Sequence, residues 1–155
     1  MKPAIFITAA AFSILCSASA QTAEQGFVKG PIFEDFGPAA SVDSELPIPE
    51  NMTLRVAFDI VAEAEEGKIN RAFESVARFM NMHAAAGVPQ GQIRPAIVVH
   101  GPAASDLLLA DAAGEVSPTA KLVEALLAED VLIYLCGQTA AAREIEKDDL
   151  IPGVQ

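Results

Sequence analysis

The chain has 155 residues, which is enough for one domain with a buried core and too few for two. Hydrophobic residues make up 52% and charged residues 20% of the sequence, a balance typical of globular proteins that excludes an intrinsically disordered chain. The formal net charge of −11 argues against nucleic-acid and anionic-lipid binding, because both depend on clustered basic groups.

Residues 1–20 have the pattern of a secretory signal peptide. Lys2 supplies a positive start, the apolar run 4–15 follows, and Ala18-Ser19-Ala20 is a small-residue cleavage site. The apolar run is too short to span a bilayer, so we expect a periplasmic or secreted protein with no membrane anchor after cleavage. Cleavage removes Cys16 and leaves Cys136 as a single cysteine, which cannot form an internal disulfide.

Residues 21–50 are predicted to form an extended, proline-rich arm. Four prolines and three glycines break this stretch, and its periodicity is poor. Its aromatic and aliphatic side chains are the expected anchors on the rest of the protein: Phe27, Ile32, Phe33 and Phe36.

Residues 51–155 alternate between aliphatic runs and helical spacings, which predicts an α/β domain with a mostly parallel sheet. The expected elements, in chain order, are a strand at 54–61, a helix at 70–86, a strand at 93–99, helices at 103–110 and 117–128, a strand at 131–135 and a helix at 139–149. Ser117 is the expected cap of the third helix, with Pro118 after it. The chain stops at residues 152–155, where a further strand is expected to begin, so either another chain completes the sheet or the sequence ends early.

Two polar residues follow predicted strands at the edge where ligands of parallel sheets gather. His100 ends the second strand in VVHGP, and Cys136 ends the third in LIYLCGQT. Cys136 precedes a predicted helix, whose free N–H groups and dipole stabilise a thiolate, and Thr139 is placed to donate a further hydrogen bond. Such a thiolate is a nucleophile or a carrier of a transferable sulfur atom.

Structural interpretations of the same residues stay open. Free cysteines are commonly packed and inert, and His100 before Gly-Pro can serve only to hydrogen-bond the turn. His83 is expected at the surface or as a helix C-terminal cap. A zinc site from His83, His100 and Cys136 lacks a CxxC motif or an i, i+4 histidine pair, so no metal is expected. No GxGxxG, P-loop or GxSxG motif is present, so no nucleotide cofactor is expected.

Three segments of the domain together resemble the DsrE/DsrF-like (YchN-like) family. They are NRAFESVARFMNMHAAAGVP at 70–89, IVVHGPA at 97–103 and VLIYLCGQTA at 131–140. The arm, GPIFEDFGPAASVDSELPIPE at 30–50, resembles the exported branch, in which a signal peptide and a proline-rich arm precede the domain. The resemblance implies a three-layer α/β/α sandwich that assembles into trimers or hexamers. It also implies a further C-terminal strand and helix, which are expected to be missing from this sequence.

The resemblance implies that Cys136 carries sulfur as a persulfide between a donor and an acceptor protein, with His100 in a supporting role. One interpretation is therefore an exported sulfur carrier or sulfurtransferase-like protein, for which turnover as an enzyme is left open. The other is a non-catalytic oligomeric binding module in which Cys136 is a structural residue.

Overall fold

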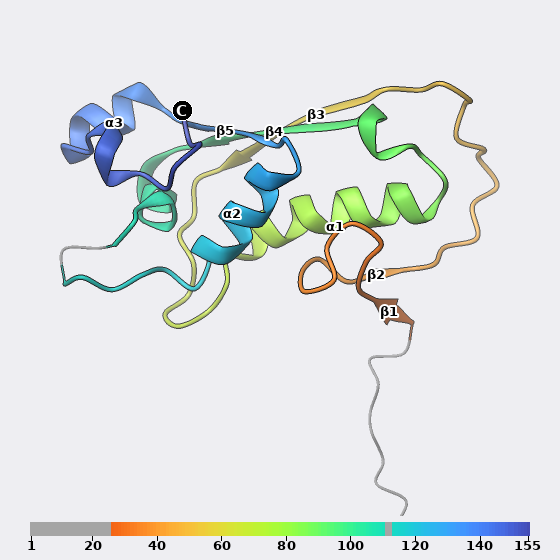
Figure 1. The fold of residues 1–155 in the computed structure, drawn as a ribbon, viewed down its shortest axis with the longest axis horizontal. Helices are drawn as coiled ribbons and strands as arrows, with labels where there is room; N and C mark the ends of the chain where they lie inside the picture. The colour runs from red at the N-terminus through yellow and green to blue at the C-terminus, as the bar shows by residue number, and fades with distance from the viewer. Residues whose placement is uncertain (1–25, 111–112) are drawn as a thin grey trace, which may run out of the picture.

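The computed structural model describes residues 26–110 and 113–155 (Figure 1). The expected signal peptide lies outside these residues. Three parallel strands form the main sheet in the order β3-β4-β5. The strands and the helices that follow them are β3 (Leu54–Ile60), α1 (Arg71–Ala85), β4 (Ile93–Val99), α2 (Ala120–Ala128), β5 (Leu132–Leu135) and α3 (Gly137–Arg143). Short 3-10 turns are η1 (Gln90–Gln92), η2 (Gly101–Leu107) and η3 (Lys147–Asp149).

The register of the sheet brings the carboxyl ends of its strands to one edge. Ile60 of β3 lies beside Val99 of β4, and Val99 lies beside Leu135 of β5. Figure 1 shows α1 and α2 on the same side of this sheet and α3 beyond the strand ends. The α/β class with a parallel sheet, predicted from the alternation of elements, is therefore confirmed.

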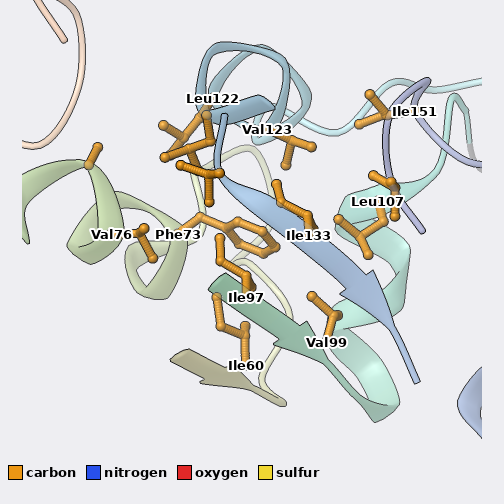
Figure 2. Packing of buried hydrophobic residues seen from close by; sticks show 14 of the residues in the cluster. Ile60, Phe73, Val76, Ile97, Val99, Leu107, Leu122, Val123, Ile133 and Ile151 are labelled. Atoms are coloured by element: carbon orange, nitrogen blue, oxygen red, sulfur yellow. The ribbon is translucent and has the colours of Figure 1, made fainter. Parts of the chain in front are cut away.

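The hydrophobic core lies between the sheet and the two long helices (Figure 2). Phe73 of α1 points from its helix towards the sheet, where Ile97 and Ile133 meet it, and all three side chains are fully buried. Leu122 and Val123 supply the contribution of α2 and are likewise buried. Burial of this many aliphatic and aromatic side chains, each worth roughly 1.5–3 kcal/mol, holds the helices on this face.

The opposite face of the sheet is largely open to solvent among the described residues. Arg55 and Ala57 of β3, Arg94 of β4 and Leu132 of β5 are all exposed on it. At the edge of β5, the N–H of Gln155 donates to the Ile133 carbonyl at 2.9 Å and the Gln155 carbonyl accepts from the Leu135 N–H at 2.7 Å. Residue 155 therefore pairs with β5 as a strand residue does.

The arm is fastened to α1 mainly by one buried side chain, Asn81. Its Oδ1 accepts from the N–H groups of Ile32 and Phe33 at 3.0 and 2.9 Å, and its Nδ2 donates to the carbonyls of Phe33, Phe36 and Gly37. Phe33 is buried against the core. Gly37 has a φ of +57°. A Cβ at this position would lie 2.2 Å from the backbone nitrogen of Arg78 in α1. The arm can approach the helix this closely only because residue 37 is glycine.

Phe27 was expected to anchor the arm, and the structure places it near α1 without burying it in the core. The side chain is 50% exposed, and it lies in β1 (Phe27–Val28), which pairs only with β2 (Ala39–Ala40). The guanidinium carbon of Arg78 lies 6.0 Å from the centre of the Phe27 ring, so this ring covers a charged side chain on α1 and does not enter the core.

A second buried polar group, Asp106, ties the loops around α1 and α2 together. Its carboxylate accepts from the N–H of Ala64 at 3.1 Å, from Asn70 Nδ2 at 2.7 Å and from Ser117 Oγ at 2.9 Å. Asn70 also caps α1, because its Oδ1 accepts from the Ala72 N–H. Ser117 was expected to cap the helix at 117–128, but α2 begins at Ala120 with Thr119 as its N-cap, and Ser117 accepts from the Thr119 N–H in the turn before it.

Two predicted helices differ from the structure in form. The 103–110 segment is a 3-10 turn, η2, which starts at Gly101. The 139–149 helix is divided: α3 begins earlier, at Gly137, and stops at Glu144, which takes a left-handed conformation with a φ of 55°. A short turn, η3, follows. The predicted continuous helix at 139–149 is therefore wrong, because the chain turns back at Glu144 to pack on η2, with the Ile151 N–H donating to the Leu107 carbonyl at 2.9 Å.

Candidate functional site

Three polar side chains stand at the carboxyl ends of the three strands. Asp59 is next to the last residue of β3, His100 directly follows β4 and Cys136 directly follows β5. Their neighbours Ile60 and Val99 are buried towards the helices. Because side chains alternate along extended backbone, Asp59 and His100 project to the opposite, solvated side of this edge.

Backbone hydrogen bonds hold these strand ends together. The N–H of His100 donates to the Ile60 carbonyl at 2.9 Å, and the N–H of Cys136 donates to the Val99 carbonyl at 2.9 Å. The N–H of Ala103 donates to the Val61 carbonyl at 3.1 Å, which fixes the start of η2 against the end of β3. The site therefore rests on the rigid part of the sheet and not on a free loop.

Thr139 links the turn after β4 to the turn after β5. Its Oγ1 accepts a hydrogen bond from the Gly101 N–H at 3.1 Å. With that lone pair occupied, the hydroxyl proton is available for the sulfur of Cys136, to which the Thr139 side chain is hydrogen-bonded. Gly101 has a φ of +51°, a conformation that favours glycine and directs its N–H towards Thr139.

The first turn of α3 lowers the pKa of the Cys136 thiol below its ordinary value of 9.0. The main cause is a hydrogen bond from the backbone N–H of Thr139, followed by one from the N–H of Gln138. Partial burial of the sulfur opposes the shift, and the side chains of His100 and Thr139 lower the pKa further. Because α3 has only seven residues, individual N–H donors carry the effect, and the dipole of a long helix is not needed.

Cys136 is partly exposed and accessible to solvent. The sulfur is thus placed where a small reagent can reach it, and donors that stabilise its anion surround it. The structure brings together Cys136 and His100, the two site residues predicted from the sequence, together with Thr139.

His83 lies away from this edge, in the last turn of α1. Its ring packs against Phe79 with 4.3 Å between ring centres, and its Nδ1 lies 2.7 Å from the Phe79 carbonyl oxygen. In the described part of the chain, no three His, Cys, Asp or Glu side chains are arranged to hold a metal ion. The zinc arrangement of His83, His100 and Cys136 therefore has no geometric support.

Sequence reasoning missed Asp59, which lies inside an aliphatic strand and has no motif around it. The structure places its Oδ1 3.3 Å from His100 Nε2. The only signal was an acidic residue near the end of a run of apolar residues, in LRVAFDIV, where a carboxylate is costly unless it reaches solvent or a partner.

An open hollow of about 1310 Å³ lies at the other end of the strands. Arg55, Arg94, Leu132 and Gly153 are among its lining residues, and Cys136 is not.

None of the helices in the described residues is long and apolar enough to cross a bilayer.

Comparison with known proteins relates most of the domain to one family. The model of the DsrE/DsrF-like family matches residues 55–155. Among solved structures, the crystal structure of the YchN protein from E. coli aligns with a TM-score of 0.48 and 21% sequence identity, over 66% of this chain and 82% of that chain. No curated protein matches the sequence.

Proposed function

This chain belongs to the DsrE/DsrF-like family, and from that premise we propose that it is an exported sulfur carrier that holds sulfur on Cys136 as a persulfide. Family membership supports a protein of the sulfur-relay type. The observation that carries the proposal for this chain is the lowered pKa of the partly exposed Cys136 thiol, caused first by the Thr139 and Gln138 N–H groups.

The transfer step needs no external oxidant or reductant. The Cys136 thiol gives its proton to a base, for which the His100 imidazole is the nearest candidate. The thiolate then attacks the outer sulfur of a donor persulfide, R–S–SH. The new S–S bond makes Cys136–S–SH, the donor S–S bond breaks, and R–S⁻ leaves. The protonated imidazole returns its proton to give R–SH, so atoms, charge and oxidation state balance.

The N–H groups around Cys136 serve both the starting and the loaded states. They stabilise the thiolate before attack, and once sulfur is loaded they lie about one S–S bond from the outer atom, which carries the charge of an ionised persulfide. The Thr139 side chain adds to the effect of these N–H groups on the pKa of the thiol.

We also propose that the protein works as a homo-oligomer, in keeping with the trimers or hexamers that the resemblance implies. The exposed face and edges of a three-stranded sheet, with Val56 and Leu132 uncovered, favour association with further copies. Light scattering coupled to gel filtration measures the mass directly, and a monomer at working concentration contradicts this part of the proposal.

Intact mass spectrometry after incubation with a polysulfide tests the sulfur-carrier function. The wild-type protein should gain about 32 Da, the mass of one sulfur atom, and cyanide or dithiothreitol should remove it. The Cys136→Ser variant should gain nothing. In protein that retains residues 1–20, Cys16→Ser is the matched control and should keep the adduct.

No adduct on the wild type, or an equal adduct on Cys136→Ser, removes the sulfur-carrier proposal. The chain is then best described as an oligomeric binding module in which Cys136 is structural.

A further inference from the structure

Asp59 is a charged residue at this edge that has no role in the transfer step described above. Its Oδ1 lies 3.3 Å from His100 Nε2, with the two side chains 72% and 39% exposed. Lys68 and Glu65 also form an ion pair, but within one turn. The Asp59–His100 pair instead links the ends of two neighbouring strands, β3 and β4, at the edge that carries Cys136.

The backbone fixes the side of the sheet on which the His100 ring lies. The N–H of His100 is bonded to the carbonyl of Ile60, the residue directly after Asp59. The backbone of His100 is extended, with φ −128° and ψ 160°, so its side chain stands on the same side of the sheet as that of Asp59. The strand thus fixes the point from which the imidazole projects, and the Asp59 carboxylate at Nε2 is the contact that orients the ring.

We infer that Asp59 is a positioning residue: it holds the His100 imidazole at Nε2 and so reserves Nδ1 for exchanging a proton with Cys136. The inference deepens the proposed function and rests on it for its chemical role. The Cys136 proton moves to Nδ1, and the imidazolium, protonated on both nitrogens, is then paired with the Asp59 carboxylate. When R–S⁻ leaves the donor, Nδ1 returns the proton to make R–SH.

The expected effect is modest because the pair is exposed. Solvent-exposed ion pairs have small energies, so losing Asp59 should slow a reaction that depends on His100 by about two- to fivefold. If Asp59 acts only as a negative charge near the sulfur, its loss should instead raise the reaction rate. Removing a like charge favours the thiolate, and the reaction then becomes faster. The sign of the effect therefore separates positioning from simple repulsion.

A double-mutant cycle tests the inference through the rate of Cys136 alkylation by iodoacetamide near neutral pH, in protein carrying Cys16→Ser. Asp59→Ala should slow alkylation about two- to fivefold when His100 is present and should change it by less than about 1.5-fold in the His100→Ala background. Asp59→Asn, which keeps an oxygen acceptor but loses the charge that pairs with the imidazolium, should recover part of the rate.

Asp130→Asn is the matched control for charge. Asp130 lies at the opposite end of β5 with a φ of 60°, a conformation that asparagine tolerates. This variant removes one carboxylate from the same sheet and should leave the alkylation rate unchanged. A merely structural effect of Asp59→Ala would alter the rate in both His100 backgrounds, whereas the inference requires the effect to vanish with His100.

An Asp59→Ala effect that is equal in both backgrounds, or a faster reaction in both, overturns the inference. The result is independent of sulfur uptake by the wild-type protein. Uptake without coupling between Asp59 and His100 removes the positioning role and leaves the sulfur carrier in place. Coupling without uptake supports the positioning role and removes the sulfur carrier.

Discussion

Replacing Asn81 with leucine should release the arm from α1. The two side chains have the same number of heavy atoms and both branch at Cγ, but leucine can neither accept from the Ile32 and Phe33 N–H groups nor donate to the Phe36 and Gly37 carbonyls. If the arm stays in place, two N–H groups near the core lose their partner at about 1–3 kcal/mol each. If it detaches, the burial of Phe33 is lost, about 1.5–3 kcal/mol, together with that of partly buried Ile32.

The less costly of these two outcomes sets the size of the effect. We therefore expect the free energy of unfolding to fall by about 3 kcal/mol, measured by urea denaturation. Amide hydrogen exchange should show faster exchange at Ile32 and Phe33, whose N–H groups are bonded to Asn81. Ser75→Ala is the matched control, since Ser75 lies exposed on the same helix and donates only to the Arg71 carbonyl.

A loss below about 1 kcal/mol in Asn81→Leu, with the Ile32 and Phe33 amides still protected, would refute this reasoning. It would mean that side-chain packing holds the arm and that the amide of Asn81 is dispensable. A loss of similar size in Ser75→Ala would point to a general weakness of α1.

Two further predictions concern the thiol. Thr139→Val removes the hydroxyl that bridges Gly101 and Cys136. The pKa of the Cys136 thiol should therefore rise, and the pH profile of its alkylation should move to higher pH. Thr139→Ser should keep the wild-type profile, whereas an unchanged profile in Thr139→Val contradicts the bridging role. Because folding lowers the pKa of this thiol, the thiolate adds stability that is fully present above the ordinary value of 9.0 and is lost as the pH falls through the folded-state pKa. The difference in unfolding free energy between the wild type and Cys136→Ser should therefore grow as the pH rises from neutral towards 9.0. Urea denaturation at several pH values measures this difference, and a difference that does not change with pH contradicts a stabilised thiolate.

The strands and the first long helix could be predicted closely from the sequence. The strand at 93–99 coincides with β4, and the helix at 70–86 encloses α1 (Arg71–Ala85), with Asn70 as its cap. These elements have strong local signals, because burial of one face imposes a regular spacing of apolar residues. The meeting of Cys136 and His100 followed from the same signals, since the ends of parallel strands share an edge.

The residues that the sequence did not reveal act over long sequence distances. Asn81 looks like a polar interruption of a helix, and its five hydrogen bonds reach back more than 40 positions to the arm. Asp106 collects donors from three separate segments. Asp59 depends on a register that pairs Ile60 with Val99. No local pattern encodes such pairs, because they exist only once the strands and loops are brought together.

The premature end of α3 has a similar origin. Local helix propensity favours continuing through 139–149, but Glu144 adopts a left-handed conformation that stops it. The following segment then reaches η2, where Leu150 pairs with Leu108 across a bridge. Tertiary contacts here outweigh the intrinsic preference of the sequence.

The backbone bonds between the strand ends also bear on how this edge can change over evolutionary time. Neighbouring strands lie about 4.8 Å apart, and the His100–Ile60 and Cys136–Val99 amide bonds keep that interval at the end of the sheet. The distances among carboxylate, imidazole and sulfur are thus inherited from the main chain. A relative with serine, aspartate or histidine at position 59, 100 or 136 would present other reactive side chains at the same spacing. Single substitutions can therefore alter the chemistry of this edge while the sheet stays the same.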